Sequence, residues 1–218
     1  MADLDSFEHM RHVMVDSQIR PNEVRDLRVI DAMRALPREA FAPAGALAYA
    51  DQDLPLGNGR FLLQPMIVAK LAQLALETNP VHALVVGAGS GYLAAVLSLA
   101  GVDVVALEEE TRLTSAALAT YAGKAQAVTG RLQAGWPAAG PYDVILIEGA
   151  VVEIPSSFAG QLVAGGRVIT ILADSPVPGA VGRAVVAEPV AGSYSCVREF
   201  DCTARLLPQF APAPAFSF

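Results

Sequence analysis

The sequence predicts an α/β fold with a doubly wound, mostly parallel sheet preceded by helices. Residues 83–101, ALVVGAGSGYLAAVLSLAG, place a glycine-rich turn between a short apolar strand pattern and an apolar helix pattern. A second apolar run, residues 102–108, follows directly and completes a strand–helix–strand unit. Both strand patterns are apolar on both faces, as expected of parallel strands buried between layers. Strand and helix patterns then continue to alternate along the chain.

Amino-acid composition and net charge limit the kinds of partner that this protein can bind. The 218 residues are 53% hydrophobic and carry a net charge of −7, with 15 Lys and Arg that form no basic run. This excludes a nucleic acid or an anionic membrane held by charge. The first ten residues lack the apolar core of a secretion signal. Cys196 and Cys202 make neither a disulfide framework nor a metal site, so we expect reduced thiols that share one face of a strand, in a cytoplasmic protein.

Residues 83–102 are long enough to cross a bilayer, but their pattern argues against a membrane span. Gly87, Gly89 and Gly91 fall within five residues, and no basic cluster flanks the segment to orient it. A glycine turn before a helix instead brings bare backbone N–H groups to a polar or anionic ligand.

The acid that follows this turn suggests a nucleoside ligand. Glu108 closes the second strand 21 residues after Gly87, where a carboxylate can accept hydrogen bonds from both hydroxyls of a ribose. The alternative is an ordinary solvated loop acid, since Glu109 and Glu110 stand beside it. Tyr92 occupies the third-glycine position of a dinucleotide fingerprint, which weakens the interpretation as an NAD site.

The remaining elements follow from periodicity and turn signals. Before the glycine turn we expect a helix over 22–36 capped by Asn22, a surface hairpin or ligand lid over 48–61, and a helix over 64–77. After it we expect a helix over 111–123, a helix over 153–164 followed by a Gly-Gly turn, and strands over 125–130, 142–150, 167–172, 182–190 and 195–207. The chain divides into an N-terminal helical and lid segment packed on the core (1–80), a ligand-binding domain (81–207) and a proline-rich tail (208–218).

Four ordered motifs resemble one known family. They are residues 14–43 with PREAF, 48–71 with PLGNGRFLLQPMIVA, 85–98 with VVGAGSGY, and 161–171 with QLVAGGRVITI. Together they are similar to the protein-L-isoaspartate O-methyltransferase family, which repairs proteins. The resemblance implies a Rossmann-like domain that binds S-adenosylmethionine. It also implies that Gly87, Gly89, Ser90 and Gly91 line the methionine part of this cofactor and that Glu108 holds its ribose.

Departures from the family pattern fall around the expected pocket. Leu63 stands where the family has a serine at the reacting carboxylate, after Phe61 and Leu62 in place of Thr-Ile. Val85 and Arg131 replace family acids, and Glu148 replaces a threonine after the fourth strand of the domain. Leu63, Gln64 and Glu148 are therefore the expected substrate-pocket residues, and no catalytic residue is assigned. An ionised Glu148 would repel an isoaspartyl carboxylate, so we expect isoaspartyl methylation to be slow or absent.

Three functions remain open at this point. The first is an S-adenosylmethionine-dependent O-methyltransferase acting on an isoaspartyl residue or another peptide or small-molecule carboxylate. The second is a non-catalytic relative that keeps the fold as a binding or regulatory protein, and the third is an NAD-dependent dehydrogenase. His9, His12 and His82 offer no general base, which an alignment mechanism does not need. Asp51 and Asp53 are either turn residues or groups that orient the acceptor, and a homodimer is left open.

Overall fold

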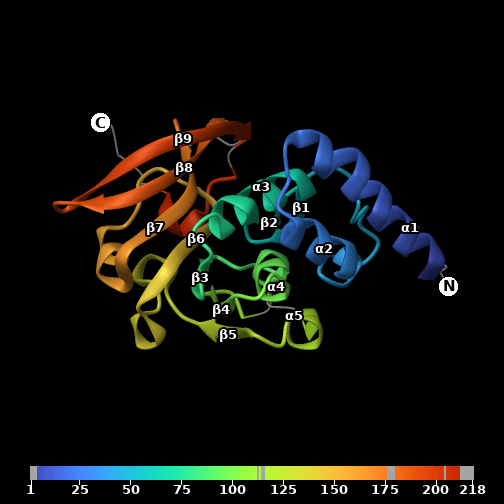
Figure 1. The fold of residues 1–218 in the computed structure, drawn as a ribbon, viewed down its shortest axis with the longest axis horizontal. Coiled ribbons are helices and arrows are strands. Elements are labelled where there is room, and N and C mark those ends of the chain that lie inside the picture. Colours follow the sequence, from blue (N-terminus) through green and yellow to red (C-terminus); the bar gives the residue numbers. More distant parts are fainter. Residues whose placement is uncertain (1–3, 112, 114–115, 176–179, 204, 212–218) are drawn as a thin grey trace.

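The predicted α/β fold is confirmed by the computed structural model, which describes residues 4–111, 113, 116–175, 180–203 and 205–211 (Figure 1). Its centre is a seven-stranded sheet in the order β5-β4-β3-β6-β7-β8-β9. These strands are β3 (His82–Val86), β4 (Asp103–Glu108), β5 (Ala125–Thr129), β6 (Tyr142–Val151), β7 (Leu162–Ala173), β8 (Val181–Val190) and β9 (Ser193–Thr203). The five strands from β5 to β7 are parallel, and β8 and β9 add an antiparallel edge.

The strand order places the expected ligand site beside β3. The chain leaves β3 toward β4 and β5, then returns to pair β6 against the other side of β3. At such a reversal the connections depart in opposite directions, which opens a ligand crevice at the carboxyl ends of the strands.

Each face of the sheet carries its own hydrophobic core. Ala83 and Val85 of β3 point into the larger core, where the N-terminal helices pack, and Leu84 and Val86 point into the smaller one. The helices are α1 (Leu4–Met14), α2 (Leu27–Ala35), α3 (Pro65–Leu76), α4 (Tyr92–Leu99) and α5 (Ala116–Tyr121). Among the described residues, the smaller core is covered by short 3₁₀ turns, including Leu132–Ala134, Ser156–Gln161 and Pro208–Phe210.

Two predicted helix boundaries were wrong. The helix expected over 153–164 is only the 3₁₀ turn Ser156–Gln161, because Pro155 and Gly160 disfavour a longer helix and Leu162 already pairs with Tyr142 in the sheet. Helix α2 begins after Asp26, whose carboxylate accepts the Arg28 N–H at 2.9 Å, and not after Asn22. For the helix expected over 111–123, α5 begins at Ala116; residues 112, 114 and 115 lie outside the described residues.

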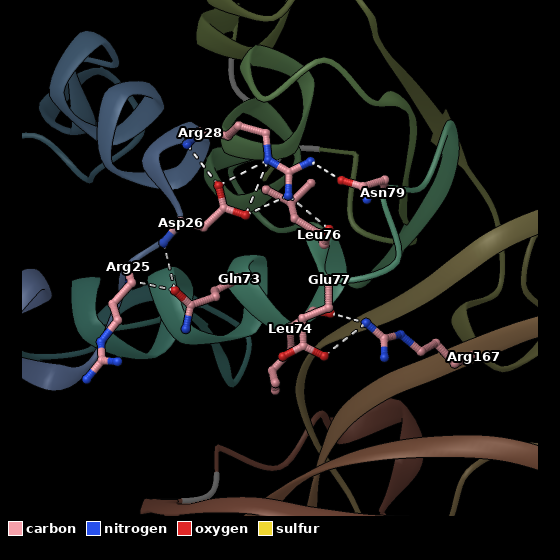
Figure 2. A network of polar contacts seen from close by, with 9 residues as sticks. All are labelled: Arg25, Asp26, Arg28, Gln73, Leu74, Leu76, Glu77, Asn79 and Arg167. Atoms are coloured by element: carbon pink, nitrogen blue, oxygen red, sulfur yellow. Dashed lines mark hydrogen bonds and ion pairs between the residues drawn. The ribbon is translucent and has the colours of Figure 1, made fainter.

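A polar network fastens α2 to α3. Gln73 accepts the backbone N–H groups of Arg25 and Asp26 at 2.6 and 3.0 Å, and Arg28 bridges Asp26 to the Leu76 carbonyl at the end of α3 (Figure 2). Arg167 of β7 reaches the same helix end at the Leu74 carbonyl and Glu77. Cationic groups are favourable at a helix C-terminus. These contacts fasten α2 to α3 and the end of α3 to β7.

The cysteines do not share a face. Cys202 pairs with Gly182 and Cys196 with Ala187, and the register shifts between these pairs because β9 has one extra residue opposite Ala184 and Val185. A one-residue bulge reverses the alternation of a strand. Cys202 accordingly packs against the larger core, whereas Cys196 is exposed.

The segment before α3 forms a hairpin, and part of the tail packs on the sheet. The expected hairpin is present as β1 (Leu54–Gly57) paired antiparallel with β2 (Arg60–Leu62). In the tail, Phe210 is buried in the smaller core, and residues 212–218 lie outside the described residues. No helix in the described part of the chain combines the length and apolarity needed to cross a bilayer.

Candidate functional site

The glycine turn lies at the carboxyl end of β3, as predicted. Gly87, Gly89 and Gly91 all have positive φ, at +73°, +53° and +90°, which side chains rarely tolerate. Gly91 caps α4, and a Cβ there would lie 3.1 Å from the Leu118 side chain. The backbone at these positions therefore approaches its neighbours more closely than a residue with a side chain would allow. Ser90 is buried within the same turn.

Tyr92 is not part of this turn's ligand surface. Its ring is fully buried in the larger core, edge-on to Phe41 and 4.8 Å from the Arg38 guanidinium carbon. Burial raises the pKa of its hydroxyl to about 12. The residue that weakened the NAD interpretation is thus a packing residue.

Glu108 is a buried organising group, so its interpretation as a solvated loop acid is wrong. The side chain is 1% exposed at the end of β4. Its Oε2 accepts the Gly89 N–H at 2.8 Å, and its Oε1 accepts the N–H groups of Glu109 and Glu110 at 2.8 and 3.1 Å. A carboxylate with several charge-assisted hydrogen bonds is held in one orientation. Glu108 and the glycine turn therefore form one unit.

Arg60 completes this unit and was missed by sequence reasoning. Its Nη1 donates to Glu108 Oε1 at 3.1 Å, and its Nη2 lies 2.9 Å from Oε2 and donates to the Gly87 carbonyl at 2.6 Å. The Arg60 side chain is also 1% exposed. A buried acid calls for a cationic partner, but neither residue's sequence position identifies the other, since α3, β3 and α4 lie between them in the sequence.

The segment Arg205–Leu207, here called the strap, crosses the same crevice. Arg205 O accepts the Ala150 N–H at 2.8 Å, and Leu207 N–H donates to Ala150 O at 2.9 Å, so the strap runs beside the end of β6. Arg205 also binds Asp53 at 2.6 Å and lies over the Phe61 ring. Leu207 covers two glycines: a Cβ at Gly149 would lie 2.6 Å from Leu207 Cγ, and one at Gly87 would lie 3.3 Å from Leu207 Cδ1.

Glu148 lies at a bulge in β6. The register against β7 shifts between Leu146 and Ala150, and Gly149 has φ of +151°. Such a bulge re-aims side chains at a strand end. Glu148 is 4% exposed and its Oε2 has no hydrogen-bond partner among the described residues. Burial, opposed by Arg60 and Arg38, raises the pKa of Glu148 to about 8.

The other two predicted pocket residues have structural contacts. Leu63 is 3% exposed within the larger core, and its carbonyl accepts from Arg38 Nη2 at 2.6 Å. Gln64 precedes α3, and its N–H donates to Asp53 Oδ1 at 2.8 Å. Asp53 therefore holds the start of α3 with one oxygen and the strap with the other, a role that neither sequence-based alternative described.

Comparison with known proteins identifies the family. The family model described as Protein-L-isoaspartate(D-aspartate) O-methyltransferase (PCMT) matches residues 9–176. The chain belongs to the protein-L-isoaspartate O-methyltransferase family. Membership confirms the predicted class of enzyme, an S-adenosylmethionine-dependent O-methyltransferase, and its cofactor, S-adenosylmethionine. The nicotinamide and non-catalytic alternatives receive no support.

Individual relatives agree with this. The protein-L-isoaspartate O-methyltransferase of Methylorubrum extorquens (strain PA1) is 45% identical over 163 residues, covering 72% of this chain and 71% of the relative. Protein-L-isoaspartate O-methyltransferase 1 of Rhodopseudomonas palustris (strain HaA2) is 39% identical over 173 residues, covering 77% and 71%. The protein-L-isoaspartate O-methyltransferase structure from Plasmodium falciparum, a complex with S-adenosyl-L-homocysteine, has a TM-score of 0.75 at 16% identity, covering 89% and 96%. This last similarity confirms the fold.

The crevice fits the cofactor in its donor and acceptor groups. Glu108 places carboxylate oxygens at the end of β4, where a ribose diol would bind, and the glycines of the turn carry no Cβ that would block a ligand from the backbone. In this structure two side chains lie close to the turn. Arg60 Nη2 would lie 3.0 Å from a Cβ at Gly87, and Leu56 Cδ1 would lie 3.1 Å from one at Gly89.

The raised pKa of Glu148 predicts a pH-dependent stability. Because its pKa in the folded state lies above the ordinary glutamate value, the folded protein retains a proton that the unfolded chain has lost between about pH 5 and pH 8. Stability therefore falls as pH rises through this range. Thermal denaturation should show wild type losing stability relative to Glu148→Gln from about pH 5 to pH 8. The exposed Glu153→Gln should track wild type, and parallel profiles for wild type and Glu148→Gln would contradict an uncharged Glu148.

Proposed function

We propose that this chain transfers the methyl group of S-adenosylmethionine to the carboxylate of isoaspartyl residues in peptides or proteins, with Glu108 as the ribose-binding residue. The observation that carries the site assignment is the buried Glu108 carboxylate, fixed by three backbone N–H groups beside the glycine turn. The acceptor follows from family membership. A small-molecule acceptor, a homodimer and a cytoplasmic location remain predictions of the sequence.

The chain's own groups have an orienting role in this reaction. When bound, the cofactor supplies an activated methyl on a sulfonium, which leaves as a neutral thioether. Because an ionised acceptor carboxylate is already a nucleophile, no protein group would have to remove a proton. Glu108 would hold the nucleoside end, the turn from Gly87 to Gly91 would line the methionine part, and the surrounding apolar residues would exclude water.

The effect of Glu148 differs from the one expected from sequence. Repulsion of an acceptor carboxylate requires an ionised Glu148, and burial raises the pKa of this residue to about 8. At neutral pH its carboxylic acid is mainly uncharged. It therefore presents a polar group without a charge beside the crevice, which removes the electrostatic objection to an isoaspartyl acceptor.

Leu63, which stands where the family has a serine, has a packing role of its own. Leu63 and Leu62 are both buried in the larger core, and Phe61 packs under Arg205 of the strap. The three apolar residues therefore have packing roles of their own. This favours a rebuilt pocket wall over a wall that has only lost its serine.

The cofactor assignment is tested by Glu108→Gln, which keeps the size of the side chain but removes its charge. The ribose hydroxyls would lose charge-assisted bonds worth about 1.5–3 kcal/mol each, so the dissociation constant for S-adenosylhomocysteine should rise about tenfold or more. Isothermal titration calorimetry measures this. Glu109→Gln is the matched control, since it removes the same charge from the adjacent, exposed residue. Equal affinity of Glu108→Gln and Glu109→Gln would refute the assignment.

The role of Leu63 is tested by Leu63→Ser. Since Leu63 lies in the core, the variant should lose about 3 kcal/mol or more of unfolding free energy through a cavity and a buried hydroxyl. It should show no gain in methyl transfer to an isoaspartyl peptide. Chemical denaturation and a radiolabelled methyl-transfer assay are run together, with the exposed Leu27→Ser as control. Faster methylation at unchanged stability would show instead that Leu63 faces the acceptor.

A further inference from the structure

The crevice assigned to the cofactor is closed by two elements of the same chain. One is the Arg60 guanidinium, which bridges both oxygens of Glu108 and the carbonyl of Gly87. The other is the strap, whose Leu207 side chain covers Gly87 and Gly149. The Arg60 guanidinium and the Leu207 side chain are buried, and they are far apart in the sequence. Two elements that are distant in the sequence therefore cover the same site in the folded protein.

Arg60 and a ribose compete for the same atoms. A carboxylate offers about four lone-pair sites. Glu108 Oε1 already accepts two backbone N–H groups and Oε2 accepts one, so one site is left, on Oε2, where Arg60 Nη2 lies 2.9 Å away. Arg60 Nη1 makes a third contact with Oε1, at 3.1 Å. A ribose hydroxyl would have to take the position of Arg60 on Oε2, so Arg60 and a ribose compete for this carboxylate.

The closed arrangement leaves polar groups unsatisfied. Arg60 Nε is buried and has no hydrogen-bond partner among the described residues, and Glu148 Oε2 is in the same condition. Buried polar atoms without partners raise the energy of the state that contains them. The closed state is thus closely packed but leaves these two polar atoms without hydrogen bonds. This cost makes it easier for a ligand to displace the closed state.

The strap is fastened by a few identifiable contacts. Two backbone hydrogen bonds join it to Ala150, and Arg205 binds Asp53, whose other oxygen receives the Gln64 N–H. Asp53 directly precedes β1, and Arg60 opens β2 of the same hairpin. The hairpin therefore carries both the Arg60 side chain and the anchor of the strap, so the two elements of closure are mechanically connected.

We propose that the Arg60–Glu108 ion pair and the strap Arg205–Leu207 form an autoinhibitory closure of the cofactor crevice. This rests on the proposed function, because it takes Glu108 as the ribose-binding residue. S-adenosylmethionine binds only to molecules in which Arg60 has left Glu108 and Leu207 has moved from Gly87. The apparent affinity is then lower than the intrinsic affinity by the fraction of open molecules.

The direct test compares S-adenosylhomocysteine binding to wild type, Arg60→Gln and Arg205→Gln by calorimetry. Arg60→Gln removes the competitor for Glu108 and should bind about tenfold or more tightly than wild type. Arg205→Gln loosens the strap and should tighten binding to a smaller extent. Arg198→Gln is the matched control, because Arg198 is an exposed arginine paired with Asp201 on β9. It should bind as wild type does.

Hydrogen–deuterium exchange on wild-type protein supplies a test that needs no variant. Ligand should slow exchange in the turn Gly87–Gly91 but speed it at Leu207, whose N–H is now bonded to Ala150. A ligand that bound without opening would protect both segments. This measurement decides the matter if Arg60→Gln does not fold.

These experiments distinguish failure of the closure proposal from failure of the proposed function. Unchanged or weaker binding by folded Arg60→Gln, or protection of Leu207 in the complex, overturns the closure. If Glu108→Gln alone still weakens binding, the cofactor site nevertheless stands. Absence of binding at millimolar ligand in wild type and in every variant contradicts both proposals.

Discussion

The carboxylate of Glu108 is the interaction on which the crevice depends. It joins the end of β4 to the glycine turn after β3 through Gly89, and joins both to the hairpin through Arg60. Leaving either charge buried without the other would cost several kcal/mol, by the general behaviour of buried ion pairs. The same carboxylate is thus a structural centre in the closed protein and the proposed ligand-binding group in the open one. Stability of the closed state and affinity for the cofactor are consequently opposed.

The sheet topology explains why such distant residues meet. The reversal of strand order beside β3 brings the ends of β3, β4 and β6 to one edge, and the bulge before Ala150 turns the end of β6 toward the strap. The N-terminal segment reaches this edge from the other side, because α3 is fastened to α2 and β7 by the network around Arg28 and Arg167 (Figure 2). These fastened elements therefore border the proposed cofactor site, and the hairpin and the strap cover it.

Much of this could be predicted from the sequence, for identifiable reasons. The strand β3, the turn after it and Glu108 lie within one local unit, whose glycine spacing and apolar runs carry strong signals. Arg60 and Leu207 could not be placed, because their contacts depend on tertiary structure and neither belongs to a local pattern. The face of Cys196 was mispredicted because a bulge in β9 leaves no signal in alternation. The raised pKa of Glu148 could not be anticipated from the sequence, because burial, which causes it, is a property of the fold.

The most direct test is a crystal structure of the protein with S-adenosylhomocysteine. We predict ribose hydroxyls within hydrogen-bonding distance of Glu108, the Arg60 guanidinium withdrawn from that carboxylate, and Leu207 displaced from Gly87. An intact Arg60–Glu108 pair, with the ligand bound beside it or elsewhere, would contradict the account.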